Sequence, residues 1–276
     1  MSLSVNTNAA SLTAQLNLQA SQARLNTSLQ RLSTGLRING AGDDPAGLVT
    51  SSLQNAQISG LTQSIANIDR GVTLVQTADS ALSNINDLLV KIRTLAADSA
   101  NTATQSDASL TANQANADAL LTTIDTIANT TKFGTVFLLD GSFDTQQFQT
   151  GAFNGEESYL TIDAADSSSL GVSGIDLTSD SGAASALDDI DLAIEAVATA
   201  RGNLGAFQVG TLQATSTNNA AQLNNLQQAQ SQLTDTNYQT EIAKYTSENI
   251  RQQAASTVLG MANQSNASIL QLLRGQ

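Results

Sequence analysis

The feature that most constrains the fold is a long apolar repeat that begins at Pro45 and continues to about residue 100. Large apolar residues recur along it at steps of mostly three and four, the spacing of a coiled coil, with a one-residue slip in phase between Val75 and Leu82. A helix over residues 45–100 would be roughly 80 Å long at ~1.5 Å per residue. A compact domain does not need such a helix, so the repeat predicts a rod with its seam at Leu61, Ile65, Ile68, Val72, Leu82, Leu89 and Ile92.

The stretch before this helix, Arg31 to Val49, cannot stay helical throughout. Its glycines permit positive φ, and Asn39-Gly40 favours a tight turn. Pro45, the only proline, disfavours the α conformation at the preceding residue and suits the first position of a helix. We therefore predict Asp44 as the N-cap of the helix, and an ordinary interhelical loop is the alternative reading of this stretch.

Residues 1–44 form an N-terminal arm with an amphipathic helical pattern. The ordinary interpretation is a helix packed in the core of its own domain. However, the few apolar side chains of the arm do not offset the conformational entropy lost on ordering about forty residues. We therefore expect the arm to be disordered in the monomer and to fold on association, through Leu12, Leu16, Leu25, Leu29, Leu32 and Leu36.

The rest of the chain predicts a return path beside the first long helix. We expect helices over residues 105–129 and 187–234, with one or two β-hairpins at about 136–163 where Asp140-Gly141 and Asn154-Gly155 signal turns. The segment Ala164 to Ala186, rich in Ser, Gly and Asp, predicts irregular structure. Residues 235–276 form a C-terminal arm with apolar positions at Ile242, Tyr245, Ile250, Val258, Ile269 and Leu273.

The expected fold is therefore mainly α. It is a long antiparallel coiled-coil rod with both termini paired as helical arms and a small β-hairpin region in the centre. The domain limits we expect are 1–44 for the N-terminal arm and spoke, 45–234 for the rod and 235–276 for the C-terminal arm. The spoke, which would join the arm to the rod, comprises Arg31, Arg37, Asn39, Gly40, Asp43, Asp44 and Pro45.

Composition excludes several classes of function. The chain has no Cys and no His, which removes thiol and imidazole catalysis, disulfides and Cys/His metal sites, and we expect no cofactor. A net charge of -13 disfavours nucleic acid and anionic membranes as partners. The N-terminus lacks the plan of a secretory signal peptide, so export would use another route. The carboxylates do not form the pattern of an active site, because Asp188 and Asp189 are adjacent and point apart on a helix, so we do not expect an enzyme.

A group of aspartates in the central region raises the question of calcium. The group does not have the spacing of an EF-hand loop or of a glycine-rich calcium repeat, so a solvated acidic face is the favoured interpretation and no metal site is predicted. Two of its members, Asp188 and Asp189, suit the first turn of the next helix, where the helix dipole favours acids. The group consists of Asp176, Asp180, Asp188, Asp189 and Asp191.

Several sequence segments at the two ends of the chain are distinctive. Those of the N-terminal part are VNTNAASL, RLSTGLRING, DDPAGL, GVTLVQTADSALSNI and IRTLAADSAN, and those of the C-terminal part are RGNLGAFQ, TDTNYQTEIAKYT and ANQSNASILQLLR. In these segments both ends of the chain resemble bacterial flagellin. The resemblance implies a structural subunit that polymerises into the extracellular flagellar filament for swimming motility. It also implies type III export, an export chaperone on the C-terminal arm, and contacts with identical subunits and with cap and hook-junction proteins.

The resemblance has limits. The centre has room only for hairpins and a loop, which implies a bare filament surface. An innate immune receptor reads an arginine, a leucine and a glutamate in some flagellins; Lys91, Leu95 and Asn116 stand at those positions, so receptor recognition is not predicted. The zinc protease inserted in some flagellins needs histidine and is excluded. The alternatives that remain are a hook-filament junction protein of the flagellum and an unrelated cytoplasmic coiled-coil scaffold.

Overall fold

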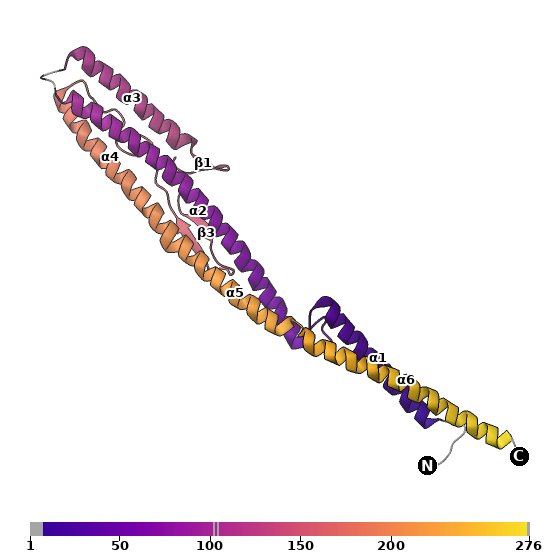
Figure 1. The fold of residues 1–276 in the computed structure, drawn as a ribbon. Helices are drawn as coiled ribbons and strands as arrows, with labels where there is room; N and C mark the ends of the chain where they lie inside the picture. The colour runs from indigo at the N-terminus through magenta and orange to yellow at the C-terminus, as the bar shows by residue number, and fades with distance from the viewer. Residues whose placement is uncertain (1–7, 102, 104, 275–276) are drawn as a thin grey trace. The chain divides into compact units, whose positions relative to one another are not determined.

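The chain forms a mainly α-helical structure with two small β-hairpins, which confirms the predicted fold class (Figure 1). The computed structural model describes residues 8–101, 103 and 105–274, with side chains described as far as Gln264. The described residues divide into two compact units, which we call the arm unit (residues 1–56 and 225–276) and the rod unit (residues 57–224). The domain limits expected from the sequence, 1–44, 45–234 and 235–276, stay a prediction.

The arm unit is built on two long helices, α1 (Ala9–Thr34) and α6 (Tyr238–Arg274). Asn8 caps α1, because its side chain accepts a hydrogen bond from the Ser11 amide. The helix ends at Gly35, which has a left-handed φ of 74° and donates its N–H to the Arg31 carbonyl. This is the common glycine end of a helix, and it turns the chain toward the spoke.

The long helix α2 (Pro45–Ser99) begins where the sequence predicted. The Asp44 carboxylate accepts a 2.9 Å hydrogen bond from the Gly47 amide, and the Asp44 carbonyl accepts one from Leu48. Asp44 is therefore the N-cap and Pro45 the first helical residue, which confirms both assignments.

The rod unit packs three helical segments around one apolar core. These are most of α2, then α3 (Asp107–Thr130) and the continuous run of α4 (Asp180–Ala206), the π-helix η1 (Phe207–Gln213) and part of α5 (Ala214–Thr234). The core is rich in large aliphatic side chains that are almost fully buried, among them Ile85, Leu89, Ile92, Ile124 and Ile190. Burial of these side chains provides most of the favourable free energy of folding of the rod unit.

Two short hairpins lie against these helices. The first pairs β1 (Lys132–Phe133) with β2 (Val136–Phe137), and the second pairs β3 (Gln146–Gln149) with β4 (Glu157–Leu160), both antiparallel. The first hairpin thus begins before the expected limit of about 136, because Gly134, with φ 64°, makes its turn. Gly155, with φ 91°, lies in the loop of the second hairpin, as the Asn154-Gly155 signal predicted.

The segment Ala164 to Ala186, expected to be irregular, is ordered against the core in its first part and helical from Asp180 on. Residues 164–179 are non-helical, yet they bury Val172, Ile175 and Leu177 in the core of the rod unit. Helix α4 then begins at Asp180, earlier than the expected 187, because the Ser179 hydroxyl accepts from the Gly182 amide and caps it. The acid in the first turn of α4 is accordingly Asp180 and not the expected Asp188 and Asp189.

Candidate functional site

Helices α1 and α6 lie side by side and antiparallel over much of their lengths (Figure 1). The buried residues of α1 are mostly small: Ala14, Ser21 and Ser28 repeat at intervals of seven, and Leu25 is the one large apolar side chain among them. Small residues let two helices approach closely, while a repeat of seven keeps one stripe of α1 facing its partner. The contact between the arms is therefore close but poor in apolar area.

Two serine-glutamate pairs lie in this contact. The Ser28 hydroxyl donates a 2.6 Å hydrogen bond to Glu241 Oε1, and the Ser21 hydroxyl donates a 3.1 Å hydrogen bond to Glu248 Oε2. The serines are seven residues apart on α1, and the glutamates are seven apart on α6. Since the helices are antiparallel, both pairs form together in one alignment only.

Cations complete the surroundings of each glutamate. Lys244 Nζ lies 3.4 Å from Glu241 Oε2, while Arg24 and Arg251 lie 3.6 and 3.4 Å from Glu248 Oε1. Burial of the Glu241 carboxyl raises its pKa, but hydrogen bonds from Ser28 and Lys244 and the charges of Lys244 and Arg31 outweigh burial, so its pKa lies below the ordinary value. Glu241 is therefore held as a carboxylate inside the arm contact.

Amide side chains fasten α1 and α6 elsewhere. The Asn8 Nδ2 group donates a 2.9 Å hydrogen bond to the Ala262 carbonyl, and the Ser11 hydroxyl donates a 2.8 Å hydrogen bond to Asn263 Oδ1. Gln252 also donates to Gln22. These hydrogen bonds between neutral groups help to fix the position of α1 along α6.

The spoke is joined to the chain segment between α5 and α6 by backbone hydrogen bonds. The Arg37 amide donates a 2.6 Å hydrogen bond to the Thr234 carbonyl, and the Thr236 amide donates a 2.8 Å hydrogen bond to the Gly35 carbonyl. These bonds flank an antiparallel bridge between Leu36 and Asp235. The arrangement fixes where the chain leaves α1 and where it enters α6.

The two spoke arginines have different partners. Arg31 Nη2 lies 3.8 Å from Asp43 Oδ1, whereas Arg37 Nη2 donates a 2.6 Å hydrogen bond to the Leu233 carbonyl. The Asp43 carboxylate also accepts from the Asn39 amide, which closes the turn at Gly40. The backbone acceptor of Arg37 had no signal in the sequence.

The described part of the arm unit exposes much apolar surface. Leu16 is 59% exposed, whereas Leu25, about 180° away around α1, is only 6% exposed. Among the side chains described between Asn8 and Gln264, most large apolar residues of the two arms are exposed and do not take part in the α1/α6 contact. We call the exposed set the arm face: Leu12, Leu16, Leu29, Leu36, Ile242, Ile250, Val258 and Met261.

The predicted packing residues of the arms are thus distributed between two environments. Leu25 lies in the α1/α6 contact, and Leu32 and Tyr245 are half-buried. Seven others belong to the arm face: Leu12, Leu16, Leu29, Leu36, Ile242, Ile250 and Val258. The side chains of Ile269 and Leu273 lie outside the described residues. Their shared role in core-arm packing stays a prediction.

The predicted seam residues all lie on the inner part of α2. Leu61, Ile68, Leu82, Leu89 and Ile92 are buried, whereas Ile65 and Val72 are half-buried. Ser64 and Gly71 occupy the fully buried positions next to those two. The expected one-residue slip between Val75 and Leu82 is therefore wrong: it came from counting only the large apolar residues of α2.

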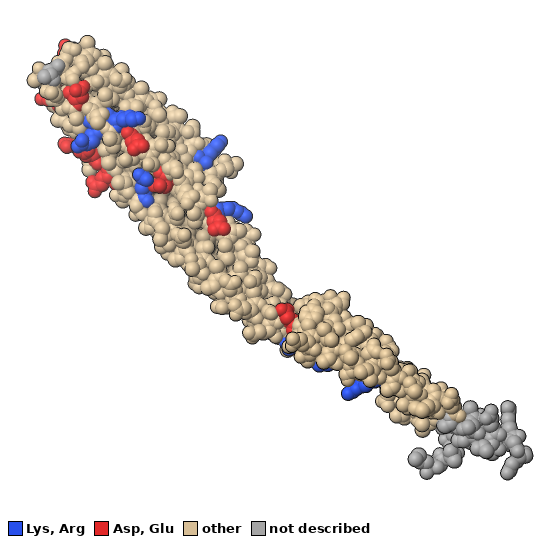
Figure 2. Space-filling view, in the orientation of Figure 1, with Lys and Arg blue, Asp and Glu red and all other residues tan. Residues whose placement is uncertain are grey.

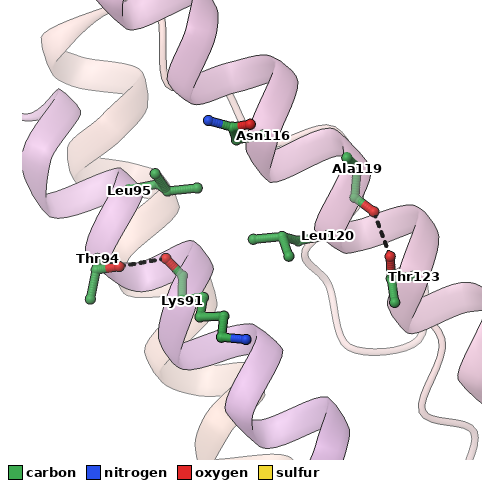
Figure 3. A pocket seen from close by; sticks show the side chains of 7 residues that line it. All are labelled: Lys91, Thr94, Leu95, Asn116, Ala119, Leu120 and Thr123. Atoms are coloured by element: carbon green, nitrogen blue, oxygen red, sulfur yellow. Dashed lines mark hydrogen bonds between the residues drawn. The ribbon is translucent and has the colours of Figure 1, made fainter.

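A shallow groove of about 380 Å³ lies between α2 and α3. Figure 3 shows Lys91 and Leu95 on one helix and Asn116 and Leu120 on the other. The three positions considered for receptor recognition, Lys91, Leu95 and Asn116, therefore share one groove. Asn116 presents a neutral amide there and no carboxylate.

Charged side chains gather over the helices of the rod unit on the face shown in Figure 2. Arg93 Nε lies 2.5 Å from Asp191 Oδ1 and its Nη2 lies 3.2 Å from Oδ2, and Arg201 Nε lies 2.7 Å from Asp79 Oδ1. The hydrogen bond from Arg93 lowers the pKa of Asp191. Asp191, one of the five acids considered for calcium, thus pairs with α2.

The described residues were also searched for a metal site and for a membrane-spanning helix. Within residues 8–101, 103 and 105–274, no cluster of three or more acids has the arrangement of a metal site. In the same ranges no helix has the length and apolar character needed to span a bilayer.

Comparison with known proteins identifies both ends of the chain. Residues 5–144 match the family model described as the bacterial flagellin N-terminal helical region, and residues 187–273 match the bacterial flagellin C-terminal helical region. A flagellin of Halalkalibacterium halodurans is 37% identical over 272 residues, which is 98% of this chain and 99% of the relative. A flagellin of Bacillus subtilis is 34% identical over 303 residues, with the same two coverages.

A solved structure shares the fold. The structure of a putative flagellar hook-associated protein from Vibrio parahaemolyticus superposes with a TM-score of 0.60 and covers 70% of this chain and 100% of its own. At 13% identity this likeness shows the fold alone. Both sequence relatives are flagellins along almost their whole length, and neither favours the hook-junction alternative. The chain therefore belongs to the bacterial flagellin family and is a structural subunit of the motility filament, not an enzyme.

Proposed function

We propose that this flagellin assembles through its arms, and that the arm face is the surface that identical subunits bury. The observation that carries the proposal is the outward orientation of Leu12, Leu16, Ile242, Ile250 and Val258 in the single chain. Large apolar patches on a soluble protein mark interaction sites, because burying them removes apolar area from water. A filament grows when one such patch contacts a different patch on the next subunit, so that the contacts do not close.

The composition of the α1/α6 contact supports folding of the arms during assembly. Its buried α1 residues are Ala14, Ser21, Leu25 and Ser28, which bury little apolar area for two helices of 26 and 37 residues. The conformational entropy lost on ordering the arms is therefore not offset within one chain. Contacts of the arm face with neighbouring subunits supply the missing apolar burial.

The division of labour within the subunit follows from the same reasoning. Residues 1–44 and 235–276 form the filament core, the spoke from Arg31 to Pro45 joins that core to the rod, and residues 45–234 form the outer part. The hydrogen bonds of Gly35 and Arg37 to Thr236 and Thr234 support a spoke that becomes ordered together with the arms. The large core of the rod unit supports independent folding of that unit.

Limited proteolysis of the monomer tests coupled folding. A protease should remove residues 1 to about 42 and the last forty or so, and it should spare the rod, because disordered termini are cut first. The same digestion of assembled filaments should leave both arms intact. Equal protection of the arms in a monodisperse monomer would contradict the proposal.

Substitution in the arm face tests the site itself. Leu16→Ser should abolish seeded polymerisation while the thermal midpoint of the rod unit stays unchanged. Thr13→Ser is the matched control, since Thr13 lies one turn away on α1, is exposed, and donates only to the Ala9 carbonyl within the helix. Normal polymerisation of Leu16→Ser would remove the arm face as the assembly surface.

Other partners follow from the need to protect the arms before assembly. An export chaperone holds the exposed apolar side of α6, with Ile242, Ile250 and Val258 as its contacts. Cap and hook-junction proteins contact the ends of the same polymer, and the filament is extracellular. Shearing of cells should release the protein into the surface fraction; retention in the cytoplasm of motile cells would contradict this location.

A further inference from the structure

The run from α4 through η1 into α5 contains one residue more than a regular seven-residue repeat allows. The buried residues Ala183, Ile190, Val197 and Leu204 of α4 follow one another at steps of seven. The next two buried residues are Leu212 and Asn219, so the step from Leu204 is eight and the step after it is seven again. The interruption falls where the chain forms η1.

The facing helix has no such interruption. In the rod unit, α2 buries one residue at alternating steps of three and four along its whole seam, without a change of phase. The series consists of Leu61, Ser64, Ile68, Gly71, Val75, Ala78, Leu82, Ile85, Leu89, Ile92, Ala96 and Ser99, and Leu74 and Ala81 are buried beside it. The extra residue on the α4–α5 side must therefore be accommodated within that side.

A π-helical turn accommodates one residue without changing the buried face. Each residue of an α-helix rotates the chain by roughly 100°, so an extra residue in continuous α-helix would carry the following seam residues off their face. A π-helix bonds residue i to i+5, so each hydrogen-bonded loop encloses one residue more than in the α-helix, and a short π-helical segment can accommodate one extra residue. The seven residues of η1, Phe207–Gln213, lie at the step of eight.

Packing around η1 shows that the seam is continuous across it. Leu212 is fully buried and lies over Gly71 of α2, where an added Cβ would meet the Leu212 Cδ1 atom and the Phe148 Cδ1 atom at 3.3 Å. The Phe207 ring lies 6.0 Å, centroid to centroid, from that of Phe148. Val209, in contrast, is 62% exposed and points away from the seam.

The residue that depends most on this phase is Asn219 of α5. Its Nδ2 group donates to Ser64 Oγ at 2.9 Å and to the Thr150 carbonyl at 2.7 Å, and Ser64 Oγ donates to the same carbonyl at 2.5 Å. All three residues are buried. This polar layer joins α2 and α5 to the end of β3, and it needs Asn219 to face α2.

We propose that η1 keeps the buried face of the α4–α5 helical run in phase. It accommodates the one extra residue of this run and thereby places Asn219 against Ser64 and Thr150. Without the π turn, Asn219 would be rotated by about 100° around the helix axis, away from the polar layer. The second hairpin would then lose its hydrogen bond to α5. Asn219 is a positioning residue for this hairpin.

Single-residue deletions in the full-length monomer test the proposal. Deletion of Val209 should convert η1 to α-helix and leave the seam in phase, so the thermal midpoint should change by no more than about 3 °C. Deletion of Ala196, an exposed residue within α4, should displace Val197 and Leu204 from the core and lower the midpoint by more than about 10 °C. Equal losses from the two deletions would overturn the proposal.

Amide exchange gives a second readout that does not depend on overall stability. Asn219→Ala should accelerate exchange in residues 146–160 by about tenfold, and by the same factor in the parent chain and in the Val209 deletion. An effect in the parent alone would show that the deletion has moved Asn219 out of the layer, and would overturn the proposal. Insertion of one alanine between Val209 and Gly210 should also accelerate exchange in this segment; unchanged protection would count against a phase requirement.

Discussion

The Ser28 hydroxyl donates a 2.6 Å hydrogen bond to the Glu241 carboxylate, and the two residues are only 5% and 4% exposed in the α1/α6 contact. A buried carboxylate is stable only when its oxygens find donors, and here one donor comes from each helix, Ser28 from α1 and Lys244 from α6. The stability of the arm contact therefore depends on Glu241 facing a serine of α1.

Ser28→Ala should weaken the filament without affecting the rod unit. It removes a hydrogen bond to a buried charged group, a loss of ~1.5–3 kcal/mol for each subunit. The critical concentration for polymerisation should rise by about one to two powers of ten. Thr27→Ala is the control, because Thr27 is only half-buried and its hydroxyl donates only to the Ala23 carbonyl of its own helix. A critical concentration equal to that of Thr27→Ala would show that the buried bond contributes nothing.

Glu241 should make the arm contact sensitive to acid. Its folded-state pKa lies below the ordinary value of 4.5, so its contribution to stability is fully present above that value and is lost as pH falls through the lower folded pKa. Turbidity of filaments titrated from pH 7 toward pH 3 measures this loss. Glu241→Gln should be less stable at pH 7 and should show a shallower decline below about pH 4.5. An unchanged acid profile would assign the decline to other carboxylates.

Gly35→Ala should impair the link between α1 and the spoke. Gly35 has φ 74°, and an added Cβ would lie 3.0 Å from the Tyr238 hydroxyl oxygen. The left-handed conformation alone should destabilise the arm unit by about 1–2 kcal/mol for a residue with a Cβ. Gly42→Ala is the matched control, since Gly42 has no positive φ and nothing within 4 Å of an added Cβ. Seeded growth rates of the two variants should differ, and equal rates would refute the strain.

Ile124→Ala should destabilise the rod unit. Ile124 on α3 is fully buried in its core, so truncation should cost about 2–5 kcal/mol, and the thermal midpoint followed by circular dichroism should fall by roughly 5–20 °C. Val90→Ala, at a 44% exposed position of α2, should change the midpoint little. The arms should be cut by protease at the same rate in both variants if the two units fold independently.

The helical parts of the fold were accessible from the sequence because they follow a periodic rule. The start of α2 at Pro45 and its seam could be predicted, since a lone proline after Asp44 and a repeat of three and four leave little choice. Whether each leucine of the arms is buried against the other arm or exposed could not be predicted. Leu16 and Leu25 are nine residues apart, which places them about 180° apart around α1, and the sequence of a single chain does not say which of these two faces contacts α6.

The errors came from residues whose role is set by context. Ser64 and Gly71 look polar or neutral, yet they fill buried seam positions, so counting only apolar residues produced a false slip on α2. The true extra residue lies at η1, where Phe207 and Leu212 hide it within an apolar pattern. The segment before α4 looked irregular because Ser, Gly and Asp dominate it, although Val172 and Leu177 anchor it in the core.

The two serine-glutamate pairs have a further consequence when the arms are considered sliding past each other. A displacement of one heptad would leave one glutamate facing a serine, while the other would face either Ala14 or Gly35, neither of which has a hydroxyl to offer. Each pair alone would accept several alignments; the two together accept one. The two serine-glutamate pairs thus fix the register of α1 against α6, and this register is the same in every copy of the subunit.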